Sequence, residues 1–181
     1  MNVEQNWRKN FSHPECSVFT FDDDGTFPNN GRCPLIVYHG VFAGDGAIEP
    51  EVVEKCFAAN DWTGSWRNGL FSYHHYHSTA HEVLGIYCGW VEALLGGPKG
   101  QTVRAAAGDV LVIPAGVAHK NIDQSADFRV IGAYPGGQFP DMNYGREEER
   151  PAADRSIEQV AMPGMDPVCG EDGPLFEAWQ R

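Results

Sequence analysis

The 181-residue sequence lacks any long apolar segment. No run approaches the roughly 18 apolar residues that a helix needs to cross a bilayer. The first ten residues, MNVEQNWRKN, also lack the apolar core of a signal peptide. We therefore expect neither membrane insertion nor secretion, and we predict a cytoplasmic protein.

Positive charge is scarce as well. The 13 Lys and Arg residues are outnumbered by 25 Asp and Glu, which gives a net charge of -12. Nucleic-acid binding depends on clustered Lys and Arg that neutralise phosphates, so a nucleic-acid partner is not expected. An anionic small molecule is not excluded, because a bound metal and a single Arg can dominate the field inside a pocket.

Cysteine is present in odd number and wide spacing, without any Cys-x-x-Cys pair. The five positions are Cys16, Cys33, Cys56, Cys88 and Cys169. This usage is typical of reduced thiols in the cytosol. A domain of this size buries about 70% of its unfolded surface, so it needs no disulfide. We expect one domain that spans residues 1–181.

Short strands dominate the middle of the chain, where Gly-rich turns separate apolar or β-branched runs. We predict strands at 35–41, 69–77, 82–88, 90–95, 101–106, 110–113, 117–122 and 128–134. Many short strands at near-regular spacing favour an all-β sandwich or barrel.

The flanking segments have a different character. One short helix is predicted at 50–60, where an apolar stripe recurs at i, i+3 and i+4 and could cover one side of the barrel. Residues 1–34 are polar and rich in turn formers, so we interpret them as an N-terminal arm before a barrel at 35–135. Residues 136–181 lose periodicity and contain five prolines, which predicts an extended C-terminal tail.

Histidine is concentrated in one place. Four of the seven histidines lie within eight residues, at His74, His75, His77 and His81, and Glu82 follows directly. His75 and His77 would project to the same face of an extended strand. With a carboxylate and a third imidazole nearby, they form a plausible set of metal ligands.

Two Gly-framed motifs surround these residues. The first runs Gly69, His75, His77, Glu82, Gly89, and the second runs Gly108, Pro114, Gly116, His119. In their spacing these blocks resemble the two motifs of the cupin superfamily. The resemblance implies a double-stranded β-helix, the cupin jelly-roll barrel, with one divalent metal inside. It also implies His75, His77, Glu82 and His119 as the ligands, and a homodimer as the default assembly.

One departure from the family pattern is visible, and it lies outside the ligand set. The second cupin motif usually has Asn four residues after its histidine, where this chain has Asp123. The stretches WRNGLFSYHHYHSTAHEVLGIYCG, GDVLVIPAGVAHK, GAYPGG and DMNYG further resemble the YjlB-like branch of cupins, from about Gly25 to the C-terminus. That branch has no assigned reaction, so the fold does not identify a substrate.

The ligand chemistry narrows the choice of metal. Three neutral imidazoles and a carboxylate suit iron, manganese, nickel, zinc, cobalt or copper. Calcium needs more oxygen ligands and is not expected. His81 is the alternative to Glu82, because it is adjacent and faces the opposite way on an extended strand. His74 is expected on the exterior or at an interface.

Strand parity suggests the lining of a substrate pocket. Phe71 and Tyr73 share a face with His75 and His77 if the strand is unbroken. Arg67 has the same parity and could bind an acidic group, although a bulge at Gly69 would change this. The alternative for Arg67 is a surface position or a structural salt bridge.

These features favour a metal-dependent enzyme acting on a small polar metabolite, with dioxygenase-type or sugar or keto-acid isomerase-type chemistry. The alternative is a non-catalytic cupin that binds or senses a small molecule. A third hypothesis is a structural role, in which the metal only staples the barrel.

Overall fold

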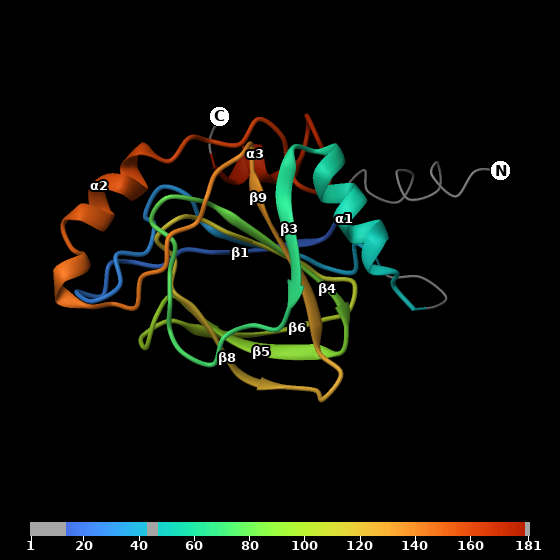
Figure 1. Ribbon diagram of the computed structural model, residues 1–181, viewed down its shortest axis with the longest axis horizontal. Helices are drawn as coiled ribbons and strands as arrows, with labels where there is room; N and C mark the ends of the chain where they lie inside the picture. The colour runs from blue at the N-terminus through green and yellow to red at the C-terminus, as the bar shows by residue number, and fades with distance from the viewer. Residues whose placement is uncertain (1–13, 43–46, 180–181) are drawn as a thin grey trace.

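Two antiparallel β-sheets face each other in the computed structural model, which describes residues 14–42 and 47–179 (Figure 1). The larger sheet has the order β1-β2-β7-β4-β9-β3, and the smaller has the order β6-β5-β8. The strands are β1 (Cys16–Phe19), β2 (Leu35–Tyr38), β3 (Trp62–Asn68), β4 (Glu82–Cys88), β5 (Trp90–Leu95), β6 (Gln101–Ala106), β7 (Val110–Ile113), β8 (His119–Gln124) and β9 (Arg129–Pro135). This arrangement confirms the predicted all-β jelly roll.

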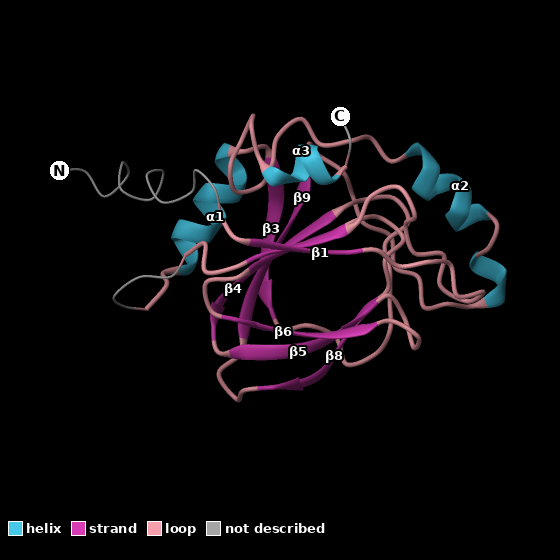
Figure 2. Ribbon diagram, turned by 180° about the vertical axis from the view of Figure 1, so that it is seen from behind, coloured by secondary structure: helices cyan, strands magenta, loops and turns pink. Residues whose placement is uncertain are grey.

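Helices lie outside the sheets. They are α1 (Pro50–Ala59), α2 (Ala152–Gln159) and α3 (Pro174–Ala178), with a 3-10 turn η3 (Glu147–Glu149). Figure 2 shows α1 and α3 on the side of the larger sheet that faces away from the smaller one. The predicted helix at 50–60 is confirmed as α1. Within the described ranges, no helix has the length and apolarity to cross a membrane.

The larger sheet is buried on both faces, because its inner face meets the smaller sheet and its outer face meets the helices. Every residue of β2 and of β7 is buried. Leu35, Val37 and Leu111 pack in the cluster between the sheets. Ile36 and Val112 pack in the cluster beneath the helices. Burial on both faces explains why these strands are continuous apolar runs without alternation.

Gly85 of β4 gives α1 room to approach the sheet. A Cβ at this position would lie 2.6 Å from Val53 Cγ1 and 2.9 Å from Phe57 Cζ. We expect Gly85→Ala to lower the free energy of unfolding by about 1–3 kcal/mol, the usual effect of overpacking a tight core. Urea unfolding measures the change. Gly164→Ala is the control, because a Cβ there meets nothing within 4 Å; equal losses in both variants would contradict this packing.

The predicted strand at 69–77 is wrong. The strand of this region is β3, at Trp62–Asn68, and residues 69–77 form an irregular segment with two single bridges, His75 to His119 and Tyr76 to Asn143. The segment leaves the larger sheet after β3 and reaches β8 of the smaller one, so it cannot form a continuous ladder in either. β3 was missed because it is an edge strand whose register shifts between Thr63 and Trp66. The shift disrupts the alternation of inward and outward side chains by which a strand is recognised in a sequence.

The other predicted strands agree with the structure more closely. The predictions at 82–88, 90–95, 101–106 and 110–113 have the bounds of β4, β5, β6 and β7. The predictions at 117–122 and 128–134 are displaced by two residues and one residue from β8 and β9, which is ordinary uncertainty at strand ends.

The two flanking segments are more ordered than predicted. Part of the N-terminal arm forms β1, which pairs with β2 at the edge of the larger sheet. The C-terminal segment is not simply extended, because it contains α2 and α3. Pro151 lies at the N-cap of α2 and Pro174 in the first turn of α3. The first backbone N–H groups of a helix have no partner within the helix, so a proline at a helix start loses no hydrogen bond. These two prolines therefore begin helices, whereas we expected prolines to prevent helices in this segment. Residues 1–13 and 180–181 of the two segments lie outside the described residues.

Candidate metal centre

Three imidazoles meet inside the barrel. One ligand nitrogen from each of His75, His77 and His119 lies within 4.8 Å of the others, and all three residues are buried. His75 and His77 come from the irregular segment before β4, and His119 is the first residue of β8. Paired backbone hydrogen bonds between His75 and His119, of 3.2 and 3.0 Å, fix the two segments against each other.

Each of these histidines directs Nδ1 at a backbone carbonyl. His75 Nδ1 lies 3.3 Å from the Tyr73 oxygen, His77 Nδ1 2.5 Å from the Asp141 oxygen, and His119 Nδ1 3.0 Å from the Val117 oxygen. A carbonyl only accepts hydrogen bonds, so Nδ1 carries the proton in all three rings. The Nε2 lone pairs are therefore available to a metal, in the arrangement typical of metal-ligating histidines.

Glu82 places a carboxylate beside two of these imidazoles, although it is not among the three residues whose ligand atoms all lie within 4.8 Å of one another. Its Oε2 lies 3.4 Å from His119 Nε2 and 3.6 Å from His77 Nε2, and the residue is 3% exposed. Burial raises the pKa of Glu82, whereas positive charge on His77 and His119 outweighs burial and holds the pKa well below its usual range. With both rings neutral, a bound cation would supply that positive charge and keep the carboxylate ionised.

His119 Nε2 provides a test of whether the residues suit a metal. The atom is fully buried and has no hydrogen-bond partner among the described residues. A buried polar atom without a partner costs about 1–3 kcal/mol, and a cation bound to its lone pair would remove that cost. The three histidines fit a transition metal, and nitrogen ligands favour borderline cations over calcium.

His81 and His74 lie outside this cluster. His81 Nδ1 accepts a hydrogen bond of 3.0 Å from the Ala115 backbone N–H, and its ring packs 4.7 Å from that of Trp179. Burial lowers the pKa of His81 to about 4. His74 packs against Phe27 at 5.3 Å between ring centroids. Neither imidazole belongs to the group that could hold the ion.

A pocket of about 270 Å³ opens onto the cluster. Its lining comprises Trp66, Arg67, Asn68, Gly69, Leu70, Phe71, His75, His77, Glu82, Tyr134 and Met142. Arg67 and Phe71 are thus at the pocket, whereas Tyr73 stacks behind Phe71 at 4.9 Å between ring centroids.

The charge of Arg67 is already paired. Its guanidinium bonds Glu51 at 2.7 Å and Glu54 at 2.8 Å, both from α1. This is the salt-bridge alternative that the sequence left open. Since two carboxylates neutralise Arg67, it is a poor binder for an anionic substrate.

Tyr134 was not anticipated from the sequence. The residue lies on β9, and its hydroxyl oxygen accepts a hydrogen bond of 2.8 Å from Trp66 Nε1. Burial and the nearby Glu82 raise the pKa of Tyr134, so the phenol keeps its proton and can donate it in a hydrogen bond inside the pocket.

Asp141 was missed as well, because it lies 64 residues from His77 in the tail. Its backbone carbonyl accepts a hydrogen bond from His77 Nδ1, and its carboxylate binds the turn that follows His77. That carboxylate accepts hydrogen bonds of 2.6 Å and 2.5 Å from the backbone N–H and hydroxyl of Ser78, and 2.8 Å from Asn143. Asp141 therefore fixes both the orientation of His77 and the loop that carries it. The only signal in the sequence was its place in the DMNYG stretch.

Removing this carboxylate should weaken metal binding without removing a ligand. We expect Asp141→Ala to lower metal affinity 10- to 100-fold, the usual effect of losing a group that orients a ligand. Competition with a chromophoric chelator measures the affinity. Asp141→Asn keeps an acceptor for the Ser78 N–H and should lose less. Unchanged affinity in Asp141→Ala would show that His77 does not depend on this loop.

Comparison with known proteins places the chain beside one curated relative. No family model matches. The uncharacterized protein YjlB of Bacillus subtilis (strain 168) is 41% identical over 167 residues, which cover 92% of this chain and 98% of that protein.

Among solved structures, the similar folds include the epimerase RmlC from Legionella pneumophila in complex with dTDP-4-keto-L-rhamnose. It has a TM-score of 0.39 and 15% identity, and the match covers 74% of this chain and 75% of that one. Acireductone dioxygenase from Bacillus anthracis, with a cadmium ion in its active centre, has a TM-score of 0.39 and 14% identity, with coverage of 78% and 91%. A DUF861 family protein from Thermotoga maritima has a TM-score of 0.31 and 20% identity, with coverage of 48% and 92%.

Proposed function

The chain belongs to the YjlB family of cupins, and from this premise we propose that it is a metal-dependent enzyme acting on a small polar metabolite. The observation that carries the proposal is the common orientation of His75, His77 and His119. All three rings are held by backbone carbonyls with Nε2 directed at one point. Glu82 contributes a carboxylate there.

The metal would be held by His75, His77, Glu82 and His119. A bound divalent ion of iron, manganese, nickel, zinc, cobalt or copper would polarise a carbonyl or activate dioxygen. The pocket volume of about 270 Å³ restricts the substrate to a small molecule.

The remaining pocket residues would orient the substrate. Trp66, Phe71 and Met142 give the pocket an apolar lining. The Tyr134 hydroxyl, fixed by Trp66 Nε1, would donate a hydrogen bond to a substrate oxygen. With Arg67 engaged by α1, a bound metal would be the main positive charge available to the substrate.

Two readouts distinguish the reaction types. Protein loaded with each metal in turn would be incubated with a panel of small sugars and keto acids. Oxygen consumption reports dioxygenase chemistry, and deuterium incorporation from solvent, followed by NMR, reports proton transfer in an isomerase. We expect one signal to exceed that of His119→Ala at least 100-fold. A metabolite that raises the melting temperature without either signal would instead favour the binding or sensing module.

The oligomeric state and the cellular location are two further predictions. The family resemblance implies a homodimer, which light scattering coupled to size-exclusion chromatography tests. The sequence also predicts a cytoplasmic protein, which cell fractionation tests.

A further inference from the structure

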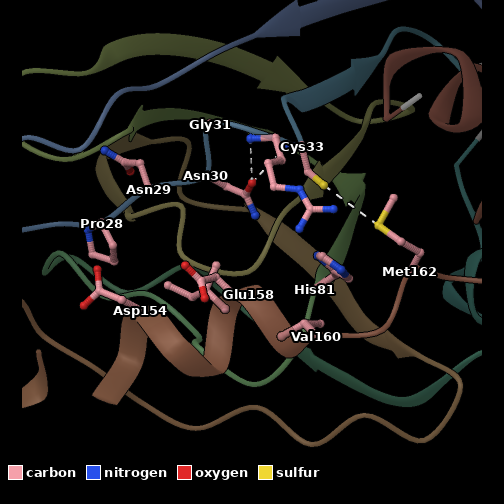
Figure 3. Close-up of a pocket in the computed structure, with 12 residues that line it drawn as sticks. Pro28, Asn29, Asn30, Gly31, Cys33, His81, Asp154, Glu158, Val160 and Met162 are labelled. Atoms are coloured by element: carbon pink, nitrogen blue, oxygen red, sulfur yellow. Dashed lines mark hydrogen bonds between the residues drawn. The ribbon is translucent and has the colours of Figure 1, made fainter. Parts of the chain in front are cut away.

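We propose a second small-molecule site on the outside of the barrel, which binds an α-amino acid with an aliphatic side chain. The site is a pocket of about 220 Å³ between the segment 28–33 and α2 (Figure 3). It is separate from the metal centre, and the proposal does not depend on the enzyme function argued above. His81, the residue before Glu82, lines this second pocket.

The wall of the pocket formed by residues 28–33 is held rigidly. Asn30 donates from Nδ2 to the Ala115 carbonyl at 2.9 Å, and its Oδ1 accepts the backbone N–H groups of Arg32 and Cys33. Asn29 is similarly used, with bonds to the carbonyls of Asp22 and Gly96. These two amides are occupied in building the pocket, so other groups must recognise the ligand.

His81 offers a buried hydrogen-bond donor. Because Nδ1 accepts the Ala115 N–H, the neutral ring carries its proton on Nε2. That Nε2 is buried, and within residues 14–42 and 47–179 no group meets hydrogen-bond geometry with it, although the Ala161 carbonyl interacts with the ring electrostatically. The side chain is 2% exposed and points into the pocket near Met162 (Figure 3). An oxygen acceptor on a ligand would satisfy this donor.

The same tautomer argues against a second metal site. Cys33 and Met162 place two sulfur atoms 3.9 Å apart in this pocket, a pair that would suit a soft cation if His81 completed it. With its proton on Nε2, however, the ring has no lone pair to offer in that direction. The pocket therefore favours an acceptor atom over a metal ion.

Two opposite charges line the pocket without pairing to each other. Arg32 comes from the wall of residues 28–33 and Glu158 from α2, and neither forms an ion pair within the described part of the chain. Asp154 also lines the pocket, but Arg150 already neutralises it. A molecule that carries both a carboxylate and an ammonium group matches this arrangement better than a simple anion or cation.

The remaining lining determines the rest of the ligand. Ile157, Val160 and Met162 provide apolar surface beside the charged groups. In the proposed mode the carboxylate lies at Arg32 and the His81 Nε2–H, and the ammonium lies at Glu158. The aliphatic side chain then contacts the apolar residues, and about 220 Å³ accommodates a single amino acid.

Three matched probes test this assignment. L-Leucine has both charges, 4-methylpentanoate lacks the ammonium group, and 3-methylbutylamine lacks the carboxylate. Titration of the ¹⁵N-labelled full chain by NMR should show L-leucine binding, with both analogues at least tenfold weaker. Equal affinity for the three probes, or no L-leucine binding at millimolar concentration, would overturn the proposal.

Variants locate the binding. Arg32→Gln and Glu158→Gln alter exposed side chains and should each weaken L-leucine binding at least tenfold. His81→Asn keeps an acceptor for the Ala115 N–H, but its shorter side chain places no donor at the position of the ring Nε2–H, and it should weaken binding similarly. Lys99→Gln, a charge change elsewhere on the surface, is the control and should bind as wild type. Wild-type affinity in both Arg32→Gln and Glu158→Gln would refute the site, as would loss of binding in His75→Ala, which would place the ligand at the metal centre.

Discussion

Purified wild-type protein should contain about one equivalent of a divalent transition metal, and His75→Ala and His119→Ala should each contain less than about a tenth of that. Each substitution removes one of the three buried imidazoles that the fold brings within 4.8 Å of one another. The two remaining imidazoles and the Glu82 carboxylate would form a weaker, incomplete site that loses its metal during purification. Elemental analysis by mass spectrometry measures the metal content.

The matched control is His74→Ala. It removes an imidazole from the same stretch of chain, but this ring packs against Phe27 and not in the cluster. Metal content in this variant should equal that of wild type. If all three variants retained equal metal, the ligand assignment would fail.

Asp166→Asn should lower the free energy of unfolding by about 3 kcal/mol or more, the scale expected when a buried charged network loses its acceptor. The Asp166 carboxylate is 0% exposed and holds the C-terminal segment to the sheet. It accepts the Tyr38 hydroxyl at 2.6 Å. It also accepts the backbone N–H groups of Val168, Cys169 and Leu175 at 2.8, 2.9 and 3.1 Å.

An amide in place of this carboxylate would turn one acceptor into a donor that faces donors. For a chain of this length, the loss corresponds to a fall in melting temperature of about 6–12 °C. Tyr38→Phe removes a single bond to the same carboxylate and should cost about 1.5 kcal/mol. A loss in Asp166→Asn no larger than that in Tyr38→Phe would show that the three backbone bonds contribute little.

Local sequence patterns were sufficient to predict the bounds of strands that are short, apolar and bounded by turns. β4 to β7 satisfy these conditions, and their bounds agree with the prediction. β3 does not, because its register shift and exposed residues remove the alternation on which the prediction depends. The segment 69–77 has strand-forming residues, but tertiary context overrides their propensity as the chain crosses between sheets.

The candidate site shows the same division. The histidines could be found because motif spacing along the chain identifies them. Arg67 was expected to share a face with His75 and His77 on the condition that one strand continued through residues 69–77. Those residues are not a regular strand, so that condition is not met. Asp141 could not be found, because it acts on residues 63 and 64 positions away. Asp166 could not be found either, because its bond to the sheet, at Tyr38, spans 128 positions, and such contacts leave no periodic pattern.

The most direct test of the metal centre is a crystal of the protein as purified, with anomalous diffraction recorded on both sides of the absorption edge of the metal identified. The account predicts one anomalous peak about 2.0–2.3 Å from the Nε2 atoms of His75, His77 and His119 and bound to Glu82. A peak elsewhere, or these four side chains hydrogen-bonded around water alone in protein that retains its metal, would contradict it.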